Sequence, residues 1–576
     1  MMSMSSSLKP TKGGLRTMPF IIVNECFEKV ASFGILPNMI FYLKEVYHLQ
    51  TVSATSILLA WSAISELMAI FGAFLSDSYL GRFRVILIGS ISSLFGTILL
   101  WSTAMIPQLQ PRSCESLVQV CKSGTDAQLT VLFFSFGLIS IGAGCVRPCS
   151  IAFGADQLAI KENPNNERIL DSYFCWYYAS SGVSIVIAFT TVVYIQDNLG
   201  WKVGFGVPAM LMFLSNLMFL FGSPYYIKLK PNKSLLTGFA QVLFVALKNR
   251  KLNLAQRSVD QYYHDHDEEL LVPTDSIRCL NKACIIVDRE RDINPDGSAS
   301  NSWSLCTVEQ VESLKALLRV IPMCSTGILM LLCINQSTFT TLQAQTMDRR
   351  IFGHFQIPAG SFTSIMIIIL TIWVAFYDRI LVPLLSKFTG CPRGLSCKVR
   401  MGIGLLLVCA ARAMSAMIET FRRSEAIEQG LENYPDGMVN MSALWLVPEY
   451  ALLGIAQAFN AIGQIEFFYF YFPKSMSSFA MALYTLEIAA SDMVGTLLVN
   501  IVDKVTSKGG KESWLSSNIN RGHLNYYYGL LTFLGLINYL YFLAICWASG
   551  HTEEGKTGTS EITEDEQIDY RELPSS

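Results

Sequence analysis

Three ionisable residues near the start of the chain, Glu25, Glu28 and Lys29, could carry protons. In a helix, residues three and four positions apart share a face, so the three side chains lie together. An apolar run precedes them, and more than a dozen residues follow before Tyr42, which places them inside an expected membrane span. Ionisable groups at that depth are costly unless they pair and line a polar cavity. The spacing therefore predicts a proton-coupling site. Alternatively, the first span begins after these residues, and the three charged side chains lie at the membrane interface.

The composition favours a membrane protein around this cluster. Of 576 residues, 51% are hydrophobic and only 15% are charged, whereas a soluble chain has about 25% charged residues. These values exclude a soluble enzyme, a disordered chain, a fibrous protein and a disulfide-dense secreted domain. The formal net charge of −2 gives no electrostatic reason to expect a nucleic acid partner. The expected surroundings are a lipid bilayer.

Twelve apolar runs are long enough to cross a bilayer, which takes about 20 residues per helix. Strand-like alternation is absent, so we expect helices, and residues 1–18 lack the apolar core of a signal peptide. Lys and Arg are slightly more frequent on the side that holds both chain ends, which favours a cytosolic N-terminus. The runs are 20–44, 54–76, 85–106, 129–150, 172–195, 203–222, 320–342, 361–385, 400–418, 443–471, 478–502 and 526–548.

A polar segment divides these runs into two sets of six, a layout typical of secondary transporters. The segment ends in an apolar-periodic stretch from Val308 to Arg319, which suggests an interfacial helix before the seventh span. We expect a disordered acidic tail. The predicted organisation is a cytosolic tail (1–18), a six-helix bundle (19–222), a cytosolic linker (223–319), a second six-helix bundle (320–548) and a cytosolic tail (549–576).

The loop after the second run, Gly72 to Arg84, resembles the loop signature of the major facilitator superfamily. The resemblance implies an all-α membrane protein with twelve transmembrane helices in two bundles. A tight turn at Gly81 would place Asp77 and Arg82 to bond neighbouring helix ends and hold one conformational state. The alternative is an ordinary basic loop beside a span.

Further segments resemble the plant nitrate and peptide transporter family, which is related to the proton-coupled oligopeptide transporters. The resemblance implies proton-driven symport by alternating access between the two halves, without a cofactor. The matching segments are Met18–Lys29, Gly72–Arg82, Arg147–Gln157, Tyr377–Arg379, Gly463–Tyr469 and Phe472–Lys474.

Residue by residue, Glu25 and Glu28 match the two family glutamates of the first span. Lys29 stands where the family often has Arg, which keeps the charge but loses the bidentate fork. Arg147 matches a fourth-span position where many members have Lys facing a tenth-span Glu. Here the matching tenth-span residue is the neutral Gln457, so that salt bridge cannot form.

Without this bridge, Arg147 needs another anionic partner. The partner could be Glu25, Glu28 or the anion of a substrate, and a purely structural pair with a glutamate is the alternative. The seventh-span His of the best-known nitrate-binding relative aligns with Cys333 here, so that nitrate ligand is missing.

Other polar span residues could line the cavity or cross-link helices. They are Asn335, Gln336, Glu466, Glu487 and Asp492, of which Gln336 joins Arg147, Cys333 and Gln457 as a substrate-binding candidate.

Two cysteines in the outer loop after the third span, Cys114 and Cys121, could close a small disulfide in an oxidising compartment. No P-loop, GxSxG, HExxH or paired CxxC motif occurs, so the sequence suggests neither an enzyme nor a metal site.

The sequence thus predicts a proton-coupled symporter that imports a small anionic solute, with low-affinity nitrate first. A hormone, glycoside or short peptide is the second candidate, and a membrane sensor or scaffold without transport is a different class. By family resemblance we expect the plasma membrane, with the vacuolar membrane second.

Overall fold

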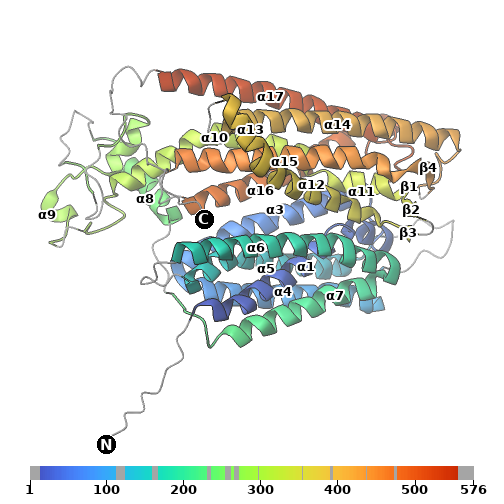
Figure 1. Cartoon of the computed structure of the whole chain (residues 1–576), viewed down its shortest axis with the longest axis horizontal. Helices are drawn as coiled ribbons and strands as arrows, with labels where there is room; N and C mark the ends of the chain where they lie inside the picture. Colours follow the sequence, from blue (N-terminus) through green and yellow to red (C-terminus); the bar gives the residue numbers. More distant parts are fainter. Residues whose placement is uncertain are drawn as a thin grey trace, which may run out of the picture.

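The computed structural model describes residues 13–111, 123–158, 166–229, 235–252, 261–264, 272–295, 298–352, 355–389, 394–435, 437–472 and 477–554. Long helices run roughly parallel through two bundles, one from each half of the chain (Figure 1). The all-α class and the two-bundle architecture are confirmed.

The N-terminal bundle holds the first six spans, and a π-helical turn ends the first (η2) and the second (η3). The fifth span runs from α6 into α7, and the chain then turns at Gly200, whose φ is 78°, to begin the sixth. The elements are α1 (Met18–Ile35), α2 (Met39–Phe41), η2 (Tyr42–Val46), α3 (Thr51–Leu75), η3 (Ser76–Leu80), α4 (Arg82–Met105), α5 (Asp126–Leu158), α6 (Asn166–Ile187), η5 (Ala188–Val192) and α7 (Val193–Gly222).

The C-terminal bundle holds the other six, and its first span is broken at Asn335 and Gln336. The elements are α10 (Val308–Ile334), α11 (Ser337–Gln345), η8 (Ala359–Phe362), α12 (Thr363–Phe376), η9 (Tyr377–Leu381), α13 (Val382–Thr389), α14 (Cys397–Glu428), α15 (Val447–Tyr471), α16 (Ser477–Thr506) and α17 (Leu524–Glu554).

Short elements lie at the two ends of the bundles. The linker, with α8 (Leu235–Lys248), η7 (Arg278–Ala283) and α9 (Arg289–Asp292), lies at one end, and four short strands lie at the other (Figure 1). We call these ends the linker side and the far side. Strand β1 (Met347–Asp348) pairs in parallel with β4 (Val439–Ser442), and β2 (Arg350–Phe352) pairs antiparallel with β3 (Phe355–Gln356).

Helices run across two of the expected domain boundaries. The helix expected to lead into the seventh span is continuous with it, because α10 runs unbroken from Val308 to Ile334. A Thr307–Gln310 capping box begins that helix at the linker. At the C-terminal end, α17 continues to Glu554, beyond the expected end of the last span at 548.

In the described residues, ten stretches are long and apolar enough to cross a membrane. One of them, Ser172–Gly222, contains both the fifth and the sixth span. The helix that holds Glu25, Glu28 and Lys29 is not among the ten. With it, the expected twelve spans are accounted for.

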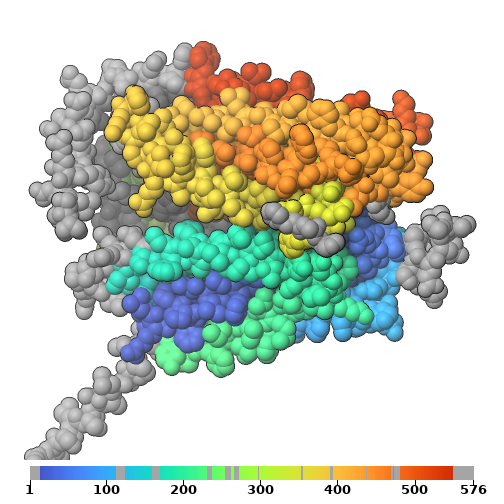
Figure 2. Space-filling view, turned by 45° about the vertical axis from the view of Figure 1, so that its right-hand side comes forward, coloured from blue at the N-terminus to red at the C-terminus, as the bar shows by residue number. Residues whose placement is uncertain are grey.

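The two halves meet along α3 and α16 and at the far side. Thr51 N donates a hydrogen bond to Ser517 Oγ (3.1 Å), and Asn500 Nδ2 donates one to Ser56 Oγ (2.9 Å). An ion pair joins Arg349 to Asp197 (3.6 Å) beside the strands. Figure 2 shows the halves as neighbouring bodies, with yellow-to-red residues packed against blue-to-green ones. These contacts hold the two halves together at the far side.

The turn between the second and third spans has the geometry that the loop motif predicts. Gly81 adopts φ 77° and ψ 152°, a region essentially reserved for glycine. Arg82, the next residue, pairs with Asp77 in the same turn (3.8 Å) and with Asp156 at the end of α5. The turn thus links three helix ends on the linker side. A gating role for these residues stays a prediction.

We expect Gly81→Ala to destabilise the protein by about 1–3 kcal/mol, because a side chain is strained in this backbone conformation. The measurement is thermal denaturation of the purified protein in detergent. Gly137→Ala is the control, since Gly137 lies in α5 with open space around it. Equal stability of the two variants would contradict the prediction.

Candidate functional site

The three ionisable residues of α1 are buried together on the linker half of the first span. Glu25 and Glu28 are 1% and 0% exposed. Lys29 Nζ lies 3.2 Å from Glu25 Oε1 and donates a hydrogen bond to Ser181 Oγ in α6 (2.8 Å). The cluster therefore faces α6 inside the N-terminal bundle, and lipid does not surround it.

The two carboxylates have different surroundings. Glu25 is paired with Lys29. Glu28 accepts a hydrogen bond from Ser32 Oγ (2.6 Å), and its second oxygen has no hydrogen-bond partner among the described residues. A buried carboxyl group that accepts a hydrogen bond from a hydroxyl group and contacts no positively charged side chain is suited to hold a proton. Glu28 and Glu25 therefore differ in their surroundings, although the sequence pattern assigns both to the predicted proton-coupling site.

Arg147 forms an ion pair with a glutamate that was not among its named candidate partners. Its Nη1 lies 3.2 Å from Glu66 Oε1 on α3, and it acts on Glu28 only over a longer distance. Helix packing brings the two together, because Gly144 of α5 lies against Met68 of α3 too closely for any side chain at Gly144. The direct carboxylate partner is therefore Glu66 rather than Glu25 or Glu28, and a substrate anion stays a predicted partner.

The Arg147–Glu66 pair is only partly buried, with side chains 22% and 20% exposed. The guanidinium also lies over the ring of Phe33 in α1, 4.7 Å from its centroid. Its buried Nε has no hydrogen-bond partner among the described residues. A reachable cation with an unused donor can bind an anion.

One signal in the sequence could have identified Glu66. It is the sole ionisable residue in the apolar run 54–76, and intramembrane ionisable residues are functional candidates by default. Nothing in the sequence shows that it faces Arg147, since 81 positions separate the two.

The C-terminal candidates lie apart from this cluster. Gln457 in α15 is half-buried and lies beside Tyr484 of α16. Gln336 accepts a hydrogen bond from Tyr527 of α17 (3.0 Å) and is fully buried. Cys333 packs its thiol against Leu531 of α17. Cys333 is thus directed into the helix packing of its own bundle, which does not support its expected contact with substrate.

Arg412 of α14 stabilises the break in the seventh span. Its Nε donates to the carbonyl of Cys333 (2.6 Å) and its Nη2 to that of Ile334 (3.1 Å). These carbonyls are unsatisfied at a helix end. Arg412 Nη1 pairs with Glu449 of α15 (2.9 Å), and both side chains are fully buried. Neither Arg412 nor Glu449 was predicted from the sequence as a site residue, and their pair has a structural role.

Arg412→Leu should destabilise the protein by about 3–5 kcal/mol, because Glu449 would be left as an unpaired buried charge. The measurement is thermal denaturation in detergent. The double variant Arg412→Leu/Glu449→Gln should recover part of the loss, since it removes the stranded charge. A double variant no more stable than the single one would count against this explanation.

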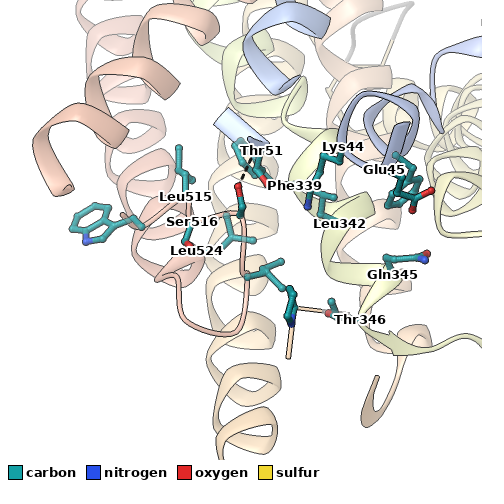
Figure 3. Close-up of a pocket in the computed structure, with 15 residues that line it drawn as sticks. Lys44, Glu45, Thr51, Phe339, Leu342, Gln345, Thr346, Leu515, Ser516 and Leu524 are labelled. Carbon is teal, nitrogen blue, oxygen red and sulfur yellow. Dashed lines mark hydrogen bonds between the residues drawn. The ribbon is translucent and has the colours of Figure 1, made fainter. Parts of the chain in front are cut away.

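A pocket at the far side is lined by residues of both halves (Figure 3). Thr51, Phe339, Gln345 and Ser517 are among its lining residues. Thr51 is fifteen residues along α3 from Glu66, or roughly 22 Å of helix. The pocket is thus separate from the charged cluster. Cys114 and Cys121 lie outside the described residues.

Comparisons with known proteins agree with this architecture. Residues 83–515 match the PTR2 profile of the POT family. Two Arabidopsis thaliana proteins are close in sequence. Protein NRT1/PTR FAMILY 1.2 is 53% identical over 94% of this chain and 90% of its own length, and NRT1/PTR FAMILY 1.1 is 52% identical over 94% and 92%.

Solved structures share the fold. An auto-inhibited POT family peptide transporter has a TM-score of 0.65 at 20% identity, covering 93% of this chain and 96% of its own. A peptide transporter POT in complex with sulfate has a TM-score of 0.62 at 13% identity, covering 94% and 97%. With the profile and the close relatives, this chain belongs to the POT family, in its NRT1/PTR branch, and is a multi-pass proton-coupled transporter rather than an enzyme.

Proposed function

We propose that this protein imports a small anionic solute together with protons, and that nitrate is the first substrate to test. The observation that carries the proposal is the partly exposed Arg147, which lies beside buried carboxylates and has an unused donor. A fixed cation in a poorly solvated site attracts anions strongly. The sulfate complex of a related peptide transporter fits anion binding in this fold.

In the proposed cycle, the proton binds first. Glu28 takes up a proton, while Glu25 keeps its pair with Lys29. The positive charge of Arg147 is then less compensated, and the substrate anion replaces Glu66 at the guanidinium. Rocking of the two halves moves the anion to the other side. The linker side is cytosolic in this proposal, and the plasma membrane is the proposed location.

The first test is uptake in injected oocytes, with nitrate and a panel of organic acids at acidic and neutral external pH. We expect acid-stimulated nitrate uptake with an inward current. Uptake of an organic acid, glycoside or peptide in place of nitrate would identify the larger-substrate alternative. No uptake of any substrate by protein at the cell surface would favour a sensor or scaffold.

Arg147→Ala should abolish uptake of the anion without reducing the amount of protein at the surface, because it removes the binding cation. Arg147→Lys, which keeps the charge, should retain part of the uptake at a raised KM. Normal uptake by the alanine variant would refute the assignment of Arg147.

Glu66→Gln should lower the KM for the anion at neutral pH by about fivefold or more, because a competing carboxylate leaves Arg147. The acid stimulation of uptake should shrink as well. The measurement is KM against external pH. Glu66→Asp keeps the competing charge and should keep the pH dependence. A glutamine variant with a higher KM at every pH would show that Glu66 only positions Arg147.

A further inference from the structure

The C-terminal bundle contains a buried carboxylate that the proposed cycle does not use. Glu487 in α16 is 1% exposed. Gln464 Nε2 of α15 donates a hydrogen bond to it, and the thiol of Cys324 in α10 lies beside it. Gln464 in turn accepts a hydrogen bond from Asn460 Nδ2 (3.3 Å). The group lies at the junction of three helices of one bundle.

No basic side chain forms an ion pair with Glu487 in the part of the chain that the structure describes, and its Oε1 has no hydrogen-bond partner there. The packed helices supply other groups. Helix α10 contributes Cys324 and α15 contributes Gln464. Tyr484 of α16 lies near both Glu487 and Glu66 of α3. Asp492, further along α16, adds a second acid. The titratable neighbours are thus acids, a phenol and a thiol.

An ionised carboxylate in such surroundings would be very costly, so the group needs a positive partner. No cluster of three or more His, Cys, Asp or Glu side chains that could hold a metal ion occurs in the described residues. Helix α10 also packs closely against the site, since a Cβ built on Gly327 would lie 2.5 Å from both Glu487 Oε2 and Gln464 Nε2. The neighbouring groups are also N–H and S–H donors, whereas a hard cation requires several oxygen ligands. A proton is the cation that fits.

We propose that Glu487 is a second proton-binding site, carried by the C-terminal half and loaded and released during transport. The N-terminal cluster and Glu487 together would move two protons with one monovalent anion. The net inward charge would then let the membrane voltage drive uptake. The transport part of this inference rests on the proposed function, but proton binding by Glu487 does not.

Infrared difference spectroscopy between acidic and alkaline pH tests proton binding without any substrate. The sample is the purified full-length protein in lipid. We expect a protonated-carboxyl band that titrates in the wild type and is lost in Glu487→Gln, while Glu512→Gln, in an exposed loop, retains it. Identical spectra for wild type and Glu487→Gln would overturn the proposal. A Glu487 band that never titrates would also overturn it, because the acid would then be a permanently neutral packing group.

The transport readout is the number of charges moved per solute, measured as current and isotope uptake in the same oocytes. Glu487→Gln mimics the protonated form in shape and should fold. We expect it to lower the charge moved per monovalent anion from about one to about zero while uptake continues, with Glu512→Gln unchanged. An unchanged ratio refutes the second proton site. Absence of uptake by the wild type would instead refute the proposed function and leave the infrared result standing.

Discussion

The free energy of placing charge in lipid is the constraint on which this structure depends. Each ionised side chain in a span needs a partner of opposite charge or a proton. Lys29 pairs with Glu25, Arg147 with Glu66 and Arg412 with Glu449. Each of these pairs is formed within one half. Neither half therefore depends on the other to neutralise these charges, which is what a mechanism with two moving halves requires.

The solvent exposure of the side chains distinguishes structural ion pairs from ion pairs that are candidates for a function. Arg412 and Glu449 are fully buried, and the arginine also satisfies two free carbonyls of a broken helix. Such a pair cannot exchange partners without a large loss of stability. Arg147 and Glu66 are partly exposed, and Arg147 keeps an unused donor. In the proposed cycle, an incoming anion competes with Glu66 for this arginine.

The two halves contact each other at the far side and along one pair of helices. Hydrogen bonds and an ion pair join the halves at the far side, and α3 lies along α16 through the middle. Helix α3 is also the helix that carries Glu66, and Tyr484 of α16 lies near both Glu66 and Glu487. The charged sites of the two halves are thus connected through the same interface along which the halves move in the proposed cycle.

Local patterns in the amino-acid sequence predict the membrane class, the spans and the helix face that Glu25, Glu28 and Lys29 share. Hydropathy and helical periodicity are local properties, which a chain displays before it folds. These patterns do not show that Arg147 pairs with Glu66 or that Cys333 packs against α17. They also do not show that Arg412 donates hydrogen bonds to the carbonyl groups at the break in the seventh span. Those contacts join residues far apart in the chain. They depend on how closely helices pack, which glycines such as Gly144 decide only once the bundle has formed.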